Sequence, residues 1–301
     1  MQINNITLPF IWALRQIGKR VKLRGWERML QILFNPEKQK KTSFQIPFFG
    51  MKYIGYSNNF IDWNVIFYGS YESFELQLFS ALAYRSEETI FIDVGANVGH
   101  HALYMSRYAN EVHAFEPNPS LWPQIKEKIS INGTKNILLH GYGLGKYSGE
   151  LPLYLGNESG ESSLLPGSNR NNQIASGLVN ILSGDQSFKE LGIHNLDLVK
   201  LDVEGYEKYA IEGMIGHLKE YRPIMMVELS QIGKEQFGSF AEFIKTFPSK
   251  YKFYSCQWLS GIIIRKVLFP VDDQIYLRFA GNIFCVPFEK EKVFKNVANR
   301  I

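Results

Sequence analysis

The side chains best suited to chemistry are acidic and stand where apolar segments end. Asp93, Glu116 and Asp202 each end a short apolar segment, and Glu204 follows Asp202 by two positions. A carboxylate in such a place costs free energy to bury unless another group pairs with it. Carboxylates serve as proton acceptors and as partners for cations or hydroxyl groups. Their repetition at the ends of apolar segments therefore indicates one shared site.

A glycine turn with the sequence D-V-G-A-N-V-G occupies residues 93–99. Gly95 and Gly99 allow the backbone to approach a ligand closely, and a helix that begins after them favours a negatively charged group. The turn is not the G-x-G-x-x-G dinucleotide fingerprint, because Asn97 and His100 stand where that pattern needs glycines. We therefore predict a nucleotide-type crevice, at the carboxyl end of a first strand, that does not bind NAD.

Glu116 lies 23 residues after Asp93, at the end of a second predicted strand. In nucleotide-binding α/β folds an acid at this place accepts hydrogen bonds from the ribose hydroxyls. The alternative is a helix-capping acid ahead of Pro117. We favour the ribose interpretation because the acid and the glycine turn together are more specific than either one alone.

Asp202 and Glu204 form a pair of carboxylates in the segment V-K-L-D-V-E-G-Y-E of residues 199–207. If the strand pattern persists, Val203 points away and both acids share a face. The alternative is that Glu204 caps the next helix and Asp202 is a structural acceptor. We favour a site role because Gly205 lets the turn pass close to a ligand.

Strands and helices alternate from about residue 89 to residue 255. The pattern predicts strands over 89–94, 111–116, 136–142, 196–202 and 223–229, and helices over 99–108, 119–131, 206–220 and 235–247. Terminal antiparallel strands are predicted over 251–256, 275–279 and 282–286. Such alternation is typical of an α/β fold with a parallel sheet covered on both faces. Residues 156–177 are rich in Gly, Ser and Asn and predict a long loop.

The first 41 residues differ in charge from the rest of the chain. They hold nine basic and two acidic side chains, a net charge of +7, whereas the other residues sum to −3. The near-neutral body argues against nucleic-acid binding. Residues 10–34 fit an amphipathic helix packed on the body with a solvated basic face, which we favour over peripheral contact with an anionic membrane. The predicted buried positions of this helix are Ile17, Val21, Trp26, Leu30 and Leu33.

The segment between this arm and the alternating region predicts short strands over 43–69 and a helix that begins near Ser73. We expect an N-terminal extension over 1–85, a catalytic domain over 86–290 and a C-terminal tail over 291–301. The 301 residues, 45% hydrophobic and 21% charged, exclude a disordered chain and a coiled coil. The two cysteines are too few for a disulfide scaffold, so we expect a reducing, cytoplasmic compartment. The sequence does not determine the oligomeric state.

The motifs resemble those of the FkbM family of S-adenosylmethionine-dependent methyltransferases. Residues 93–99 are similar to its first motif, residues 114–118 (A-F-E-P-N) to the segment after its second strand, and residues 202–207 to its D-x-E-G-x-E hallmark. Further similarities are S-S-L at 162–164, Y-E at 71–72, V-E at 227–228 and N-I-F-C-V-P at 282–287. The acidic turn of many relatives is replaced within residues 179–185, so no role is carried over to Asp185.

The resemblance implies a Rossmann-like class I methyltransferase sheet, mostly parallel with an antiparallel last strand. It also implies S-adenosyl-L-methionine as the cofactor. The turn from Gly95 through Asn97 to Gly99 would support the methionine part, with Asp93 near its ammonium group and Glu116 on the ribose. The adenine would lie near Asn118 or near Tyr142 and Leu144.

An acceptor hydroxyl is a poor nucleophile at neutral pH and needs a base or a metal. The carboxylate candidates are Asp202, Glu204 and Glu228, among which we expect Glu204 to lead, and the histidine candidates are His100 and His194. We predict no metal site, and a divalent ion on Asp202 and Glu228 is the minor alternative.

The resemblance favours an O-methyltransferase that acts on a hydroxyl of a glycan or glycan precursor. A natural-product or other small-molecule hydroxyl is the second acceptor class. The alternative to a methyltransferase is a protein module that binds a nucleotide cofactor and does not transfer a methyl group. We expect the acceptor pocket to form from residues 56–72, 157–177 and 256–273.

Overall fold

The computed structural model of the chain describes residues 8–20, 25–84, 88–156, 162–166, 174–259 and 265–301. Among them, no helix combines the length and the apolar character that crossing a bilayer requires. Val21, one of the predicted buried positions, lies outside these residues, as does most of the loop predicted over 156–177.

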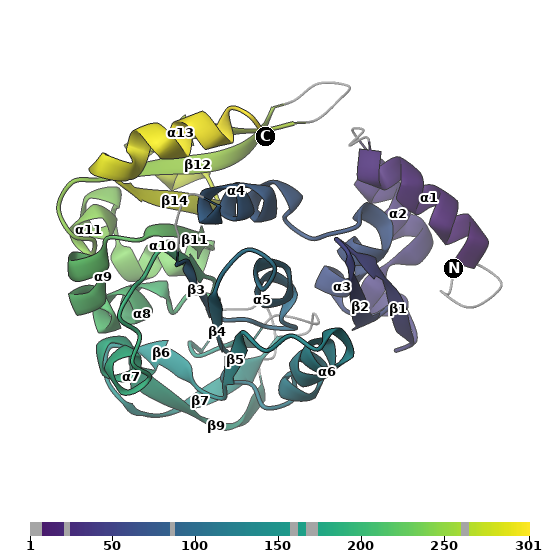
Figure 1. Ribbon diagram of the computed structural model, residues 1–301, viewed down its shortest axis with the longest axis horizontal. Helices are drawn as coiled ribbons and strands as arrows, with labels where there is room; N and C mark the ends of the chain where they lie inside the picture. Colours follow the sequence, from purple (N-terminus) through teal and green to yellow (C-terminus); the bar gives the residue numbers. More distant parts are fainter. Residues whose placement is uncertain (1–7, 21–24, 85–87, 157–161, 167–173, 260–264) are drawn as a thin grey trace.

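An eight-stranded sheet forms the centre of the molecule (Figure 1). Its strands in spatial order are β13 (Arg265–Pro270), β12 (Tyr251–Leu259), β14 (Gly281–Pro287), β11 (Ile224–Leu229), β10 (Leu198–Leu201), β3 (Ile90–Val94), β4 (Glu111–Phe115) and β5 (Ile137–His140). The five strands from β11 to β5 are parallel, whereas β14 runs antiparallel to β11 and β12. This confirms the predicted α/β class and the mostly parallel sheet.

The strand order reverses between β3 and β10, because the chain continues from β3 to β4 on one side and from β10 to β11 on the other. Ligands of open α/β sheets bind beside the carboxyl ends of the strands at such a reversal. The fold therefore places the glycine turn after β3 and the acid pair after β10 at one crevice.

The two faces of this sheet bury alternate strand residues. Phe91 packs on the face covered by α4, α5 and α13, while Ile92 packs on the face covered by α7 to α12. The helices are α4 (Ser73–Ala83), α5 (His100–Met105), α6 (Trp122–Asn132), α7 (Gly184–Glu190), α8 (Glu207–Gly213), α9 (Ile215–Tyr221), α10 (Gln231–Phe237), α11 (Phe240–Lys245), α12 (Asp273–Arg278), the 3-10 turn Phe288–Lys290 and α13 (Glu291–Ala298). Two faces of buried apolar residues explain why the strands read as continuous apolar runs.

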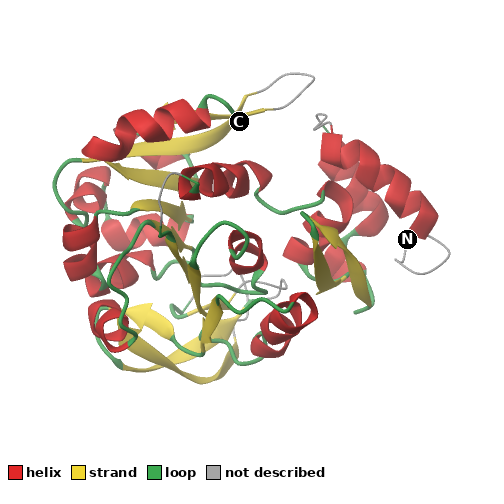
Figure 2. Cartoon of the chain, viewed as in Figure 1, coloured by secondary structure: helices red, strands yellow, loops and turns green. Residues whose placement is uncertain are grey.

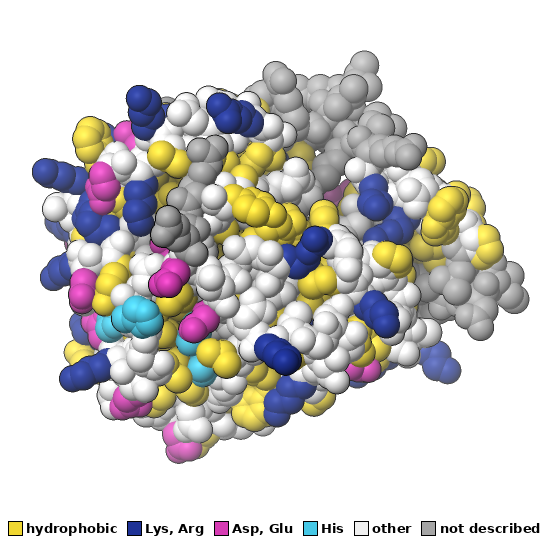
Figure 3. All heavy atoms as spheres, in the orientation of Figure 1, with side chains coloured by type: hydrophobic (Ala, Val, Ile, Leu, Met, Phe, Trp, Pro, Cys, Tyr) yellow, Lys and Arg dark blue, Asp and Glu magenta, His cyan; other side chains and the backbone are white. Residues whose placement is uncertain are grey.

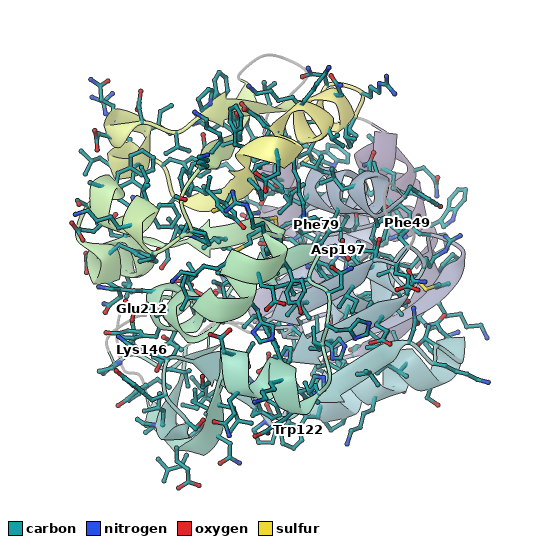
Figure 4. All side chains as sticks on the ribbon, turned by 60° about the vertical axis from the view of Figure 1, so that its left-hand side comes forward. Phe49, Phe79, Trp122, Lys146, Asp197 and Glu212 are labelled. Atoms are coloured by element: carbon teal, nitrogen blue, oxygen red, sulfur yellow. The ribbon has the colours of Figure 1, made fainter. Side chains whose placement is uncertain are left out.

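A second, four-stranded sheet lies beside the first and was not anticipated from the sequence (Figure 2). It consists of β6 (Gly143–Gly145), β9 (Ile174–Ser183), β7 (Gly149–Leu155) and β8 (Ser162–Ser163). An ion pair of 3.1 Å between Lys146 and Glu212 ties the end of β6 to α8 (Figure 4). The expected loop over 156–177 is therefore wrong at residues 162–163 and 174–177, which belong to β8 and β9 and pair with β7.

The N-terminal elements gather at one side of the molecule (Figure 1). They are α1 (Leu8–Arg20), α2 (Trp26–Phe34), the 3-10 turn Pro36–Lys38, β1 (Ser43–Phe48), β2 (Met51–Tyr56) and α3 (Phe60–Tyr68). The hairpin of β1 and β2 confirms the strands predicted there. The strand expected at residues 62–68 is wrong, because the Asn59 side chain caps the N-terminus of α3 and Gly69 ends the helix with a positive φ.

Two further expectations differ from the structure. Residues 275–279 were expected as a strand but lie mainly in α12, whose N-terminus is capped by Asp272. Of the four described positions predicted as buried in the arm, Leu30 is fully buried and Trp26 is half-buried. Ile17 and Leu33 are 44% and 38% exposed, because the arm forms two separate helices rather than one.

Arg15 joins α1 to the rest of the N-terminal elements. Its guanidinium donates hydrogen bonds to the carbonyl oxygens of Val65, Ile66 and Pro47, and the residue is 8% exposed. At least one of the positive charges in residues 1–41, that of Arg15, is therefore buried and hydrogen-bonded within the fold rather than exposed to solvent. Removing the guanidinium takes a charged donor away from these three carbonyl groups.

We expect Arg15→Leu to lower the free energy of unfolding by about 2–4 kcal/mol, since it removes charged hydrogen bonds to buried acceptors. Lys19→Leu, at an exposed position of the same helix, is the control and should change it by less than about 0.5 kcal/mol. Urea unfolding of both variants measures the difference. Equal free energies for the two variants would show that the Arg15 bonds do not stabilise the fold.

Candidate functional site

A row of charged and polar residues crosses the sheet near its carboxyl edge. Asp93 of β3 pairs in register with Lys200 of β10, and Glu228 of β11 pairs with Asn282 of β14. All four belong to the alternate positions that face α4 and α5, next to Phe91, Leu198, Met226 and Phe284. The strand alternation therefore places these groups on one face.

Lys200 is the cation of this row and is 3% exposed. Its Nζ lies 3.1 Å from an oxygen of Asp202 and 3.7 Å from an oxygen of Asp93. Although burial lowers the pKa of Lys200, the carboxylates of Asp202, Asp93, Glu72 and Glu228 raise it overall. The lysine therefore stays charged and offsets part of the acidic cluster.

Asp93 is fully buried and has two partners inside the protein. One carboxylate oxygen accepts a hydrogen bond of 3.1 Å from the backbone N–H of Ala102, and the other faces Lys200. Asp93 thus anchors the first turns of α5 to β3. Its expected contact with the cofactor ammonium stays a prediction.

Glu116 lies across the glycine turn from Asp202. Its two carboxylate oxygens accept hydrogen bonds from the backbone N–H groups of Asn97 (2.7 Å) and Asn118 (2.8 Å). Burial raises the pKa of Glu116 to about 7, although both backbone bonds lower it. Each oxygen keeps a further lone pair, so the carboxylate can also accept bonds from two neighbouring hydroxyls.

Gly95 is required by the close approach of the two loops. It has a φ of 80°, and a Cβ at this position would lie 1.8 Å from the backbone oxygen of Asp202. A side chain would therefore push the first turn and the acid pair apart. Gly99, with a φ of 74°, begins α5 in the left-handed region.

A small cavity of about 40 Å³ lies between these loops. It is lined by Val94, Gly95, Asn97, Glu116, Pro117, Gly143, Leu144, Leu153, Ser162, Leu164, Asp202, Val203 and Glu204. The structure thus brings together the glycine turn, Glu116, Leu144 and both acids of the pair. Leu153, Ser162 and Leu164 of the second sheet and its flanking loop complete the wall.

The turn after β10 is held in an unusual conformation. β10 ends at Leu201 and Glu204 has a φ of 51°, so the predicted continuation of the strand is wrong, although both acids still line one cavity. The Glu207 carboxylate accepts bonds from the backbone N–H groups of Gly205 (2.9 Å) and Val203 (3.4 Å). Strain in a non-glycine residue of this kind persists where surrounding contacts hold it, commonly at functional sites.

The S-S-L element also holds this turn. The Ser163 hydroxyl donates a hydrogen bond of 2.8 Å to the backbone oxygen of Glu204 and accepts one of 3.1 Å from the N–H of Leu165. The second sheet is therefore fastened to the loop that carries the acid pair. Sequence similarity of the S-S-L element had indicated the segment but not this contact.

A much larger cavity, of about 1100 Å³, lies on the other side of the acids. It is lined by Gly25, Trp26, Glu27, Arg28, Gln31, Phe60, Asn64, Tyr68, Ser70, Tyr71, Glu72, Glu75, Glu228, Cys256, Gln257, Trp258, Lys266, Phe279, Ala280, Gly281 and Asn282. Two of the three segments expected to form an acceptor pocket, 56–72 and 256–273, contribute to this wall. Helix α2 and residues 279–282 were not expected there.

Glu228 connects the two cavities electrostatically. The nearby charge of Asp202 raises the pKa of Glu228 well above its ordinary value, and burial, Glu72 and Glu204 add to this effect. Lys200 opposes the shift. A carboxyl group with a raised pKa is a better proton acceptor near neutral pH than an ordinary one.

Glu72 and Glu75, at the start of α4, form the acidic end of the larger cavity. Glu72 accepts a hydrogen bond from the Asn282 amide and lies 3.1 Å from His101, while Glu75 forms an ion pair with Lys266. Burial opposes ionisation of Glu72, but the bond and the charge of His101 lower its pKa to about 2. The Y-E similarity at 71–72 pointed to this segment without indicating its role.

Several predicted residues do not line either cavity. The Asn118 side chain accepts bonds from Ser120 (3.0 Å from its N–H), and the Tyr142 hydroxyl lies 2.8 Å from that of Ser187. His194 is exposed before β10, at the opposite edge of the sheet, so it is wrong as a base candidate. His100 is buried against the Tyr71 carbonyl, and burial lowers its pKa well below the ordinary value.

Four residues of this cluster had not been singled out as site candidates from the sequence: Lys200, Glu72, Glu75 and Asn282. The signal for Lys200 was a lysine inside an apolar strand, two positions before an acid. Within the described parts of the chain, no group of three or more His, Cys, Asp or Glu side chains could hold a metal ion. The carboxylates are instead offset by Lys200, Lys266 and His101.

A family model described as the methyltransferase FkbM domain matches residues 93–254, which is more than half of the chain. The chain belongs to the FkbM methyltransferase family. The span begins at Asp93 and includes the glycine turn, Glu116 and the acid pair. Membership of this methyltransferase family implies S-adenosylmethionine as the methyl donor.

Similarity to individual proteins covers a smaller share of the chain. The hexuronic acid methyltransferase AglP of Haloferax volcanii is 32% identical over 135 residues, which are 44% of this chain and 53% of AglP. The methyltransferase sdnD of Sordaria araneosa is 28% identical over 41% of this chain and 59% of its own. The chain thus spans between half and two thirds of the length of these relatives.

A crystal structure of an FkbM methyltransferase from Methylobacillus flagellatus is 14% identical. The structural match covers 69% of this chain and 47% of the M. flagellatus chain, with a TM-score of 0.44.

The residues around the small cavity fit S-adenosylmethionine in their chemistry. Asp202 and Glu204 suit a cofactor with a positive sulfonium, and Glu116 offers acceptors for a ribose diol. Its present volume of about 40 Å³ is far below the roughly 300 Å³ or more that ligand pockets have. The cavity would therefore have to widen to hold the cofactor.

We expect Glu116→Gln to weaken binding of S-adenosylhomocysteine by at least about tenfold, a loss of about 1.4 kcal/mol. The substitution replaces one carboxylate oxygen with an NH₂ group. This group faces a backbone N–H, which is also a donor, and it cannot accept a hydrogen bond from a ribose hydroxyl. Isothermal calorimetry measures the affinity. Glu127→Gln, an exposed acid on α6, should bind as the parent does. Unchanged affinity in Glu116→Gln would exclude the ribose role.

Proposed function

We propose that this FkbM methyltransferase transfers a methyl group to a hydroxyl of a sugar in a glycan or glycan precursor. The observation that carries the proposal is the position of the acids between the two cavities. Asp202 and Glu204 line the small cavity by the glycine turn, and Glu228 lines the larger one. A hydroxyl held at the inner end of the larger cavity would lie next to Glu228, whose pKa the nearby charges of Asp202 and Glu204 raise.

The larger cavity has the character of a carbohydrate site. Its wall combines flat aromatic side chains, such as Trp26 and Trp258, with amides such as Asn64 and Gln257. Aromatic surfaces bind the apolar faces of a ring, and amides fix the orientation of polar groups. The name of the similar AglP, a hexuronic acid methyltransferase, supports a sugar acceptor. The similarity to sdnD keeps a natural-product hydroxyl as the second candidate.

S-adenosylmethionine, when bound, supplies a methyl group on a positively charged sulfur. The protein must hold the hydroxyl, exclude water and take up one proton. We propose that Glu228 accepts the proton, since it lines the acceptor cavity and has a raised pKa. Glu204, expected to lead, would orient the acceptor from the cofactor side, and Asp202 would hold Lys200 and set the pKa of Glu228.

Purified protein should transfer a methyl group from S-adenosylmethionine to sugar hydroxyls in a panel of nucleotide sugars and cell-surface glycans. Product mass and the methylated position are determined by mass spectrometry and NMR. A panel of natural-product alcohols is assayed in parallel. Transfer to those alcohols alone would overturn the sugar acceptor, and no calorimetric binding of the cofactor would overturn methyl transfer itself.

The rate should rise with pH as Glu228 loses its proton, because only the ionised carboxylate accepts one. Asp202→Asn removes the largest cause of the raised pKa and should move the acid limb of kcat/KM to lower pH. Glu228→Gln should reduce kcat by about 10²–10⁴ and retain cofactor binding. A pH–rate profile measures both effects, and an acid limb that persists in Glu228→Gln would assign the proton to another group.

Although the sequence favours N-terminal helices packed on the body, their exposed apolar side chains lead us to propose peripheral contact with an anionic membrane as well. Trp12 and Phe10 of α1 are 64% and 50% exposed, and Ile32 of α2 is 76% exposed. Figure 3 shows hydrophobic and basic side chains side by side on the N-terminal part of the surface. Exposed aromatic and aliphatic groups within a segment of charge +7 suit an interfacial helix.

Trp12→Ser combined with Ile32→Ser should reduce pelleting with vesicles that contain anionic lipid by about tenfold, since both groups leave the interface. Residues 1–41 are unsuitable for deletion because Leu30 and Phe34 are fully buried. Leu277→Ser, 71% exposed on α12, is the control. Equal pelleting of all three proteins would exclude this surface.

A further inference from the structure

We infer that the inner end of the larger cavity is a subsite for a neutral or amino sugar and disfavours a hexuronic acid. This inference rests on the proposed function and deepens it, because it specifies the charge of the acceptor. It sets this chain apart from the similar AglP, whose name states a hexuronic acid substrate. Three features of the described lining residues support it.

The first feature is the balance of charge. The lining residues include four acids, Glu27, Glu72, Glu75 and Glu228, and two bases, Arg28 and Lys266. Lys266 is already paired with Glu75. Lys200 and His101 do not line the cavity; Lys200 is paired with Asp93 and Asp202, and His101 with Glu72. Acids outnumber bases among the lining side chains, so the wall disfavours an entering carboxylate.

The second feature is a buried acceptor atom that lacks a donor. Oδ1 of Asn282 has no hydrogen-bond partner among the residues that the structure describes. Asn282 is 7% exposed and lines the cavity. A buried acceptor without a donor costs free energy, so this atom favours a ligand that brings a donor.

The third feature fixes the orientation of the Asn282 amide. Its nitrogen donates to the carboxylates of Glu72 and Glu75, the latter at 3.5 Å. The reversed amide would place its oxygen against two carboxylates, which is unfavourable. The amide oxygen therefore remains an acceptor. Hydroxyl and ammonium groups can donate to it, whereas a carboxylate offers only acceptors.

These features describe a ligand rich in donors and without negative charge. A hydroxyl of a neutral sugar can donate to the Asn282 amide oxygen, and the ammonium group of an amino sugar also matches the acidic wall. Trp258 on β12 and Tyr71 before α4 supply flat surfaces for the ring. The acceptor hydroxyl would then face Glu228.

The test uses three matched probes with the protein saturated in S-adenosylhomocysteine: methyl glucoside, methyl glucosaminide and methyl glucuronide. Saturation-transfer NMR titrations give their affinities. We expect the glucuronide to bind at least about tenfold more weakly than the other two, a difference of about 1.4 kcal/mol. Equal or tighter binding of the glucuronide, or no binding of any probe, would overturn the inference.

Two substitutions change the net charge of the cavity wall in opposite directions. Glu75→Gln removes a negative charge and should narrow the discrimination against the glucuronide, whereas Lys266→Met removes a positive charge and should widen it. Glu242→Gln, an exposed acid on α11, is the control and should leave it unchanged. If Glu75→Gln fails to fold, Lys266→Met still tests whether the charge of the wall sets the discrimination against the glucuronide. No change in either variant relative to the control would contradict the electrostatic argument.

Failure of this inference is distinguishable from failure of the proposed function. Methyl transfer to uronic acids with no transfer to neutral or amino sugars would overturn the charge preference and leave the methyltransferase intact. Absence of transfer to any hydroxyl would overturn the proposed function, and the probe affinities would then decide the subsite by themselves.

Discussion

The buried ammonium group of Lys200 is the interaction on which the site depends. A lysine that is 3% exposed must keep its charge paired, and Asp93 and Asp202 supply the partners from two neighbouring loops and strands. A shift of one residue in the register of β10 would turn Lys200 to the opposite, apolar face. The pairing therefore fixes the register of β3 against β10, and with it the distance between the glycine turn and the acid pair.

The same cluster carries more negative than positive charge, which has a chemical consequence. Lys200 offsets Asp93 and Asp202 only in part, so Glu228 beside them resists ionisation. A cationic methyl donor in the small cavity would be attracted to this excess, and its charge would in turn favour the ionised form of Glu228. Binding of the donor and readiness of the base are therefore coupled through one set of charges.

The sequence was sufficient for the parallel sheet, because buried parallel strands must be continuously apolar and must alternate with helices. It located the acids correctly for the same reason, since polar groups follow such strands where they end. It could not show α3, whose aromatic and β-branched residues also suit a strand until Asn59 caps them as a helix. The contacts of Glu72 with His101 and Asn282 join distant segments, and no local pattern encodes such pairing.

The two cavities are lined by different parts of the chain, and this difference explains why family membership does not specify the acceptor. The small cavity, which we propose for the cofactor, is lined entirely from within residues 93–254, the span of the FkbM domain. The larger cavity, which we propose for the acceptor, is lined, apart from Glu228, by residues 25–75 and 256–282, which lie outside that span. Under this proposal the segments that surround the shared domain would set the choice of acceptor. Relatives matched over the shared part alone can differ in acceptor while they keep the same methyl-transfer chemistry.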